Sequence, residues 1–276
     1  MALTVNTNLT AMNSVASLNS TTKSLSGTLA RISSGSRINK AADDASGLAV
    51  AENLSAISQS ARAASRNIND GVSVVQIAEG ATKEVGNILK RMRELAVTSA
   101  SETLNDSERV YIQDEFTQLA SEVDRIANVT EFNGTALTEG TNATLAVQVG
   151  VNNTADDQID ITLGDLQGTV LGVDTGSVDL SSATGASTAI GDIDTAIDTL
   201  NQYRSDYGAV QNRLESAQRN LQTYTENISA AESVIRDADF AYEASEMSKF
   251  QVMQQAGVAA LGQANSINQA ATQLLR

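Results

Sequence analysis

Apolar residues recur along most of this chain at alternating intervals of three and four residues, and the chain contains no proline. This spacing is typical of α-helices that pack lengthwise against other helices. Because proline breaks helices, its absence allows each helix to continue for many turns. The pattern occurs in five stretches, over residues 11–32, 54–96, 112–126, 193–235 and 250–274. The sequence therefore predicts a mainly α fold, with helices long enough for an antiparallel coiled-coil rod.

Many of the apolar positions in these stretches hold Ala or Gly. Small residues let two helices approach closely, but each buries little surface, so an isolated terminal pair should be only marginally stable. We therefore expect the terminal helices to need partners for assembly, whereas an ordinary intramolecular coiled coil is the alternative. The predicted contact positions are Val15, Leu18, Leu25, Leu29, Ile32, Phe250, Met253, Gly257, Ala260, Ala264, Ile267, Ala271 and Leu274.

The apolar period changes to two between the helical halves, over about residues 131–186. Residues 145–151 and 159–163 alternate in polarity on either side of a polar loop, which predicts a β-hairpin with one covered face. Asn133 and Gly134 form a dipeptide typical of tight turns. Gly, Ser and Thr dominate residues 172–188, which we expect to be turns and loop. A small β insert between the helices is the prediction.

The composition excludes several classes of function. The chain has neither His nor Cys, so it lacks the usual transition-metal ligands, thiolate chemistry and triads that use an imidazole. The net charge of −15 argues against nucleic-acid binding. No run of residues is apolar enough to predict a membrane-spanning helix, and the N-terminus lacks the pattern of a cleaved secretion signal. We expect no enzymatic activity, no metal and no cofactor.

The helical pattern changes phase between residues 235 and 250, which predicts a joint between two helical regions. The matching joint in the first half of the chain is expected between residues 33 and 44, where Gly35 favours a non-helical backbone. The residues expected at this joint are Gly35, Arg37, Asn39, Asp43, Asp44, Asp237 and Asp239.

Several segments resemble the bacterial flagellins. Residues 32–48 are similar to the stretch that links the first two helices of that family, and residues 89–97 to a motif of its second helix. Residues 131–134 match the family's turn after the third helix, and residues 230–241 match a segment near the C-terminus. The final Leu274, Leu275 and Arg276 are also similar. The resemblance covers about residues 1–135 and 190–276, and the variable middle of the family is minimal here.

The resemblance implies a structural subunit that is exported unfolded through the flagellar type III apparatus and polymerises into the extracellular filament used for motility. Residues 1–40 and 236–276 would supply the two halves of an inner coiled-coil domain. Residues 41–235 would form the helical rod with the β insert. The alternative within the same system is a hook–filament junction protein, and a cytoplasmic coiled-coil scaffold is a more distant one.

The resemblance also implies partners. These are other copies of the chain, an export chaperone at the C-terminal helix, and the hook-associated and cap proteins. In animal hosts the monomer would be recognised by the Toll-like flagellin receptor through Arg91, Leu95 and Glu115. Arg91 and Leu95 are one helical turn apart and so share a face. Contacts of Arg91 and Glu115 with neighbouring subunits are the alternative role.

Overall fold

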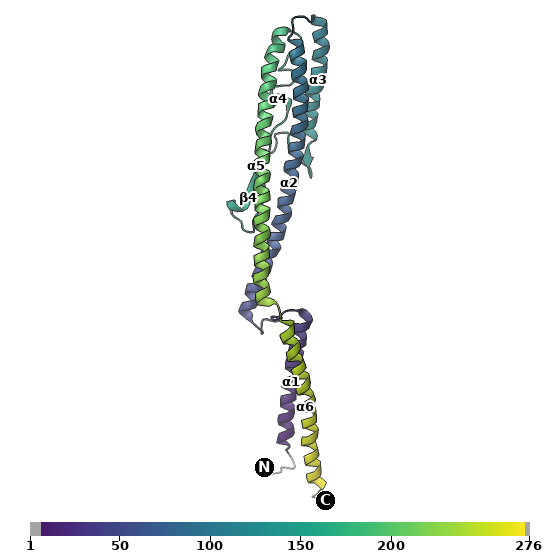
Figure 1. Cartoon of the computed structure of the whole chain (residues 1–276), viewed down its shortest axis with the longest axis vertical. Helices are drawn as coiled ribbons and strands as arrows, with labels where there is room; N and C mark the ends of the chain where they lie inside the picture. Colours follow the sequence, from purple (N-terminus) through teal and green to yellow (C-terminus); the bar gives the residue numbers. More distant parts are fainter. Residues whose placement is uncertain (1–6, 274–276) are drawn as a thin grey trace. The chain divides into compact units, whose positions relative to one another are not determined.

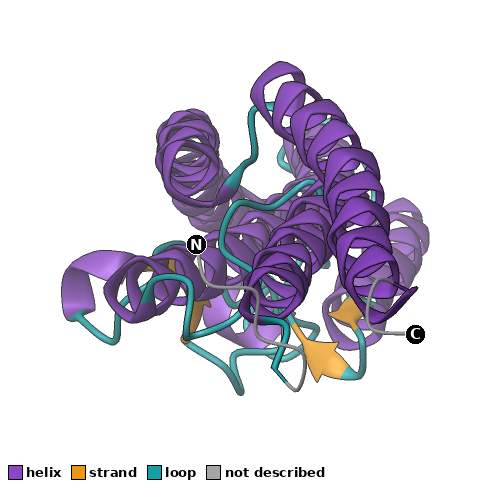
Figure 2. Cartoon of the chain, turned by 90° about the horizontal axis from the view of Figure 1, so that it is seen from below, coloured by secondary structure: helices purple, strands orange, loops and turns teal. Residues whose placement is uncertain are grey.

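The computed structural model describes residues 7–273, with side chains up to residue 266. Helices make up most of it and the strands are short (Figures 1 and 2). The helices are α1 (Leu9–Ser34), α2 (Ala45–Ser99), α3 (Asp106–Val129), α4 (Gly168–Leu171), α5 (Ala183–Arg236) and α6 (Phe240–Gln273). The strands are β1 (Glu131–Phe132), β2 (Thr135–Ala136), β3 (Thr144–Gln148) and β4 (Gln158–Thr162), with a 3-10 turn at Ala155–Asp157. The predicted fold class is confirmed.

The chain divides into two compact units. Met1–Ser58 and Asn227–Arg276 form one, called the terminal unit below, and Gln59–Glu226 forms the other, called the central unit. Each unit therefore combines segments from both halves of the sequence, and the divisions fall inside the long helices α2 and α5.

The central unit is built on α2 and α5, which lie side by side and antiparallel (Figure 1). Arg93 of α2 pairs with Asp194 of α5 at 2.6 Å, and Gln218 of α5 donates to Ser65 of α2 at 2.8 Å. Large apolar residues of α2, α3 and α5 form one continuous cluster. The predicted α2 positions within this unit are all buried, namely Ala61, Ala64, Ile68, Gly71, Val75, Ala78, Thr82, Val85, Leu89, Met92 and Ala96.

The predicted β-hairpin is confirmed. Strands β3 and β4 are antiparallel, with Leu145 opposite Ile161 and Val147 opposite Ile159. Alternate residues of β4 are buried, so one face of the hairpin covers a second apolar cluster with α2 and α5. A Cβ on Gly71 of α2 would lie only 3.1 Å from Val147, so the glycine permits this close approach.

The segment after β4 is more ordered than its composition predicts. Helix α5 begins at Ala183, within the stretch expected to be loop, because the Ser182 hydroxyl accepts a hydrogen bond from the Gly185 N–H at 3.1 Å. Six apolar residues between β4 and α5 are buried: Leu163, Leu166, Leu171, Val173, Val178 and Leu180. The prediction of turns and loop over 172–188 was therefore wrong from Ala183 onward.

Tyr207 offers a direct test of the hairpin's attachment to α5. Its side chain is 1% exposed, its hydroxyl accepts a hydrogen bond from the Gly164 N–H at 2.9 Å, and burial raises its pKa. We expect Tyr207→Phe to lower the free energy of unfolding by about 1–3 kcal/mol, because a buried N–H loses its acceptor. Denaturant unfolding measures this change. Tyr111→Phe, at a side chain 74% exposed, serves as the control and should leave stability unchanged.

The terminal unit contains the antiparallel pair α1 and α6 (Figure 1). Their backbones approach closely, as expected for a contact rich in small residues. A Cβ on Gly257 of α6 would lie 3.2 Å from the Leu18 side chain of α1. Asn8 caps the N-terminus of α1 and also donates to the Ala264 carbonyl of α6 at 3.1 Å.

Candidate functional site

The chain leaves α1 through a glycine and meets the link between α5 and α6. Gly35 has φ 69° and ψ 3°, the left-handed conformation that ends many helices. The next residue, Ser36, forms an antiparallel bridge with Asp237. Two backbone hydrogen bonds accompany this bridge, from Arg37 N–H to the Arg236 carbonyl at 2.7 Å and from Ala238 N–H to the Gly35 carbonyl at 2.9 Å. The links α1–α2 and α5–α6 are therefore fastened to each other.

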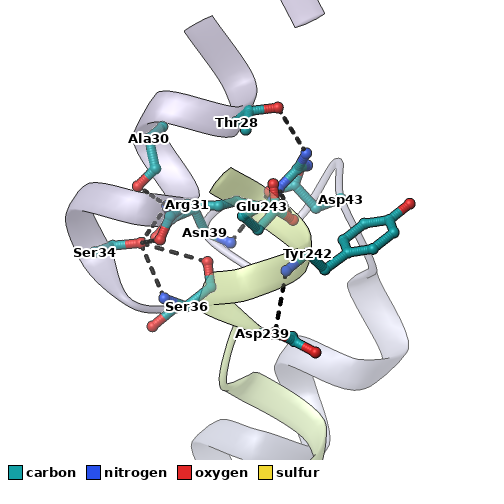
Figure 3. Close-up of polar contacts among 10 residues, drawn as sticks. All are labelled: Thr28, Ala30, Arg31, Ser34, Ser36, Asn39, Asp43, Asp239, Tyr242 and Glu243. Carbon is teal, nitrogen blue, oxygen red and sulfur yellow. Dashed lines mark hydrogen bonds and ion pairs between the residues drawn. The ribbon is translucent and has the colours of Figure 1, made fainter. Parts of the chain in front are cut away.

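Carboxylates order both links through backbone N–H groups. Asp43 accepts from the N–H groups of Asn39 and Lys40 at 3.1 and 2.9 Å, and Asp239 caps α6 by accepting from Tyr242 (Figure 3). Asp44 caps α2, where its hydrogen bond from the Gly47 N–H, aided by the Ser46 hydroxyl, lowers its pKa.

All seven residues expected at the joint lie in these two links. Asn39 also donates to the Ala30 carbonyl and to the Ser34 hydroxyl, and the Arg37 guanidinium donates to the Ile235 carbonyl at 2.7 Å. The phase change in the sequence was the signal that located this cluster.

Two glycines, Gly35 at the C-cap of α1 and Gly27 inside α1, test the conformation at the joint. Gly35→Ala should destabilise the terminal unit by about 1–2 kcal/mol, because a Cβ is strained in the left-handed region. Gly27→Ala lies within the helix with open space around it, and should stabilise it by about 0.5–1 kcal/mol. The melting temperatures of the two variants, measured by circular dichroism on assembled chains, are compared. Equal melting temperatures would contradict the assigned backbone at Gly35.

Of the thirteen predicted positions in the contact between α1 and α6, six are buried or half-buried, four are exposed and three lie outside the described side chains. Leu18, Leu25, Ile32, Phe250, Gly257 and Ala264 are buried or half-buried as expected. Val15 and Leu29 remain 42% and 47% exposed, while Thr21 and Thr28 beside them are buried. Met253 and Ala260 are also exposed. Leu274 lies outside the described residues, as do the side chains of Ile267 and Ala271.

Many large apolar side chains of this helix pair consequently face solvent. In α1 these include Leu9 and Met12, at 67% and 63% exposed, and in α6 they include Val252 and Val258, at 65% and 56%. Residues 252 and 258 do not share one face of α6. A helix that is apolar on several faces is normally surrounded by other protein.

The second predicted site lies on α2 and α3 in the central unit. The Arg91 guanidinium donates to Glu115 of α3 at 2.7 Å and to Glu94 at 3.0 Å, and these bonds raise its pKa. Arg91 and Glu115 are exposed, so the pair is accessible. Leu95 is only 6% exposed and belongs to the apolar core, so it is not accessible for the direct contact that the resemblance implied.

The described residues hold no group of His, Cys, Asp or Glu arranged to bind a metal ion. Within the same part of the chain, every helix is too short or too polar to cross a membrane.

Comparison with known proteins decides the family. The model of the bacterial flagellin N-terminal helical region matches residues 5–143, and that of the C-terminal helical region matches residues 190–275. This chain belongs to the bacterial flagellin family. The two matches flank the β3–β4 hairpin and the segment that leads into α5, so the middle of this flagellin is short.

Curated relatives match along their full lengths. A flagellin of Halalkalibacterium halodurans is 42% identical over 274 residues, which is 99% of each chain. The flagellar filament 33 kDa core protein of Treponema phagedenis is 37% identical, and a flagellin of Bacillus subtilis is 36% identical, each again covering 99% of both chains.

Solved structures of flagellar proteins resemble this chain as well. A Bacillus cereus flagellin, 30% identical, has a TM-score of 0.50 over 60% of this chain and 94% of that chain. A putative flagellar hook-associated protein from Vibrio parahaemolyticus has a TM-score of 0.58 but is 14% identical, so it shares the fold alone. The sequence relatives therefore favour the flagellin interpretation over the hook–filament junction protein. As a flagellin, the chain is a structural subunit of the extracellular flagellar filament, and it is not an enzyme.

Proposed function

We propose that this flagellin polymerises through its terminal unit. The observation that supports this proposal is the set of large apolar side chains on α1 and α6 that the pair leaves uncovered. Burial of one such side chain contributes about 1.5–3 kcal/mol, so a few per subunit would hold a polymer together. Contacts between different surfaces of successive copies propagate into a helical filament instead of closing into a dimer.

Seeded assembly tests this proposal. The full chain and a version truncated after Ile235, which lacks α6, are each added to short filament seeds and viewed by negative-stain electron microscopy. We expect long filaments from the full chain and none from the truncation. Filaments from both would assign polymerisation to the central unit, and failure of the full chain would contradict the proposal.

Export in an unfolded state through the flagellar type III apparatus is part of the same proposal. A chain without Cys cannot form aberrant disulfides on reaching an oxidising exterior. An export chaperone would cover the apolar surface of α6 before assembly. Co-purification of the full chain and of the chain truncated after Ile235 with the chaperone would test this, and equal recovery would place the chaperone elsewhere. Cap and hook-associated proteins would contact the assembled subunits at the filament end.

A second candidate function, recognition by the host Toll-like flagellin receptor, is favoured by the exposed Arg91–Glu115 pair. The ion pair joins α2 to α3 and presents a guanidinium at a fixed position, as interface hot spots do. The buried Leu95 would contribute indirectly, by packing in the core and so holding α2, which carries Arg91, in place. We expect Arg91→Ala to reduce receptor activation by purified monomer about 30-fold, as for a hot spot of 2 kcal/mol.

Arg125 provides the matched control for this experiment. It is an exposed arginine of α3 paired with Glu122 at 2.7 Å. Arg125→Ala should leave receptor activation unchanged. An equal effect of the two substitutions would contradict the assignment of the site to Arg91.

A further inference from the structure

Glu243, in the first turn of α6, is a carboxylate that the family assignment does not explain. It is 5% exposed, whereas the other carboxylates that order this region lie at the surface. One carboxylate oxygen, Oε1, forms an ion pair with Nε of Arg31, in the last turn of α1, at 2.8 Å (Figure 3). Neither Arg31 Nε nor the other carboxylate oxygen, Oε2, makes a hydrogen bond. A buried acid with a single partner depends strongly on that partner.

Both charges occupy the helix ends that suit them. Arg31 lies in the last turn of α1, where unsatisfied carbonyl groups favour a cation. Glu243 lies in the first turn of α6, where free N–H groups favour an anion. Thr28 is fully buried beside the pair, and its hydroxyl accepts a hydrogen bond from Arg31 at 3.4 Å. The geometry around the two charges is therefore specific to this one alignment of α1 and α6.

The middle of the helix pair has little that could select an alignment. Thr21 bonds the Ser17 carbonyl of its own helix, and Gly257 and Ala264 are small residues that fit many neighbours. If α6 moved by one heptad along α1, Arg31 would face Phe250 in one direction, and Glu243 would face Ser24 in the other. Each displacement would leave a buried charge without compensation, which is strongly unfavourable.

We propose that the Arg31–Glu243 pair sets the register of α1 against α6, acting as a positioning pair for the terminal unit. Asn8, which binds the Ala264 carbonyl at the opposite end, fits the same alignment, as does the contact between Leu18 and Gly257. A single polar pair in an otherwise permissive helix contact is known to specify register. The inference rests on the proposed polymerisation through the terminal unit, since the register fixes which side chains face neighbouring copies.

Because the chain has no native cysteine, introduced thiols report the register directly. Leu18→Cys with Gly257→Cys reports the observed alignment, while Leu18→Cys with Ala264→Cys or Phe250→Cys reports a shift of one heptad. Each pair is placed in subunits that are co-assembled with an excess of wild-type chain, and the filaments are then oxidised. As a control, subunits that carry only one of the two cysteines are mixed, so that a disulfide can form only between molecules. Such disulfides run as dimers on non-reducing gels, whereas a link within one subunit does not.

The decisive variant is Arg31→Met with Glu243→Gln, which removes both charges and keeps similar side-chain volumes. Replacing a buried ion pair by neutral residues often leaves stability unchanged, so these subunits should still enter filaments. With three alignments about equally populated, the 18–257 link should fall about threefold and the shifted links should appear. Arg31→Lys retains the cation and should keep the 18–257 link.

Glu246→Gln is the control, because it makes the same change at a half-buried α6 residue whose ion pair, with Lys249, lies within its own helix. An unchanged 18–257 yield in the double variant would overturn the proposal. Exclusion of that variant from wild-type filaments would also overturn it, by assigning the pair to stability and not to alignment. Failure of the wild-type chain itself to assemble would count instead against polymerisation through the terminal unit.

Discussion

Val252→Glu is expected to abolish filament assembly at ordinary protein concentrations. Val252 is 65% exposed on α6, and the proposed polymer contacts would bury it in every subunit. The substitution removes an apolar contact and places a charge where water is excluded, which together cost about 3–5 kcal/mol. Since 1.4 kcal/mol is a factor of ten in affinity, the critical concentration should rise at least about 100-fold.

Sedimentation of seeded filaments over a range of subunit concentrations measures this effect. Gln251→Glu is the matched control, because it adds the same carboxylate at the preceding exposed residue of α6. The control should raise the critical concentration far less, since Gln251 is already polar. Unfolding of the central unit should be the same in both variants. Assembly of Val252→Glu at the wild-type concentration would show that this face of α6 stays open to solvent.

The central unit was predictable because large side chains decided the phase of its helices. Ile68, Leu89 and Met92 share one face of α2, and the structure buries all three. The hairpin was predictable for a similar reason, since the alternation in Gln158–Thr162 buries Ile159 and Ile161 together. In both cases the apolar side chains are buried against other parts of the same chain.

The terminal unit was harder to predict because its apolar residues do not all pack within one molecule. Sequence reasoning placed Val15 and Leu29 in the contact of α1 with α6, but Thr21 and Thr28 are buried there instead. Threonine fills a close helix contact by bonding a carbonyl of its own helix, as Thr21 does. The apolar character of a residue does not show whether it packs within its own chain or against another copy of the chain.

Two further features lacked a usable sequence signal. The buried Leu166 and Leu180 are isolated apolar residues among Gly, Ser, Thr and Asp, so no period marked the segment as part of the core. The Arg31–Glu243 pair spans most of the chain length, and two charged residues in separate helices give no sign of their contact. The position of Leu95 was misjudged because residues one turn apart share a helix face without being equally exposed.

Phe116→Ala should produce the largest loss of stability in the central unit. Phe116 of α3 is fully buried in the cluster that also contains Leu89 and Met92 of α2 and Ile193 of α5. Truncation of a buried phenylalanine typically costs 3–5 kcal/mol, because the cavity adds to the lost transfer free energy. For a unit of this size, each kcal/mol lowers the melting temperature by about 2–4 °C, so a fall of about 6–20 °C is expected.

The loss should be cooperative, because the cluster that contains Phe116 joins α2, α3 and α5. Calorimetry of the monomer measures it, with Phe240→Ala as the control at a side chain 59% exposed. If α3 were attached mainly by the exposed Arg91–Glu115 pair, Phe116→Ala would have a small effect and Arg91→Ala a large one. Exposed ion pairs contribute about 0–1 kcal/mol, so we expect the reverse order. The exposed surface of α2 and α3 that holds Arg91 and Glu115 would then depend on a residue buried in the core.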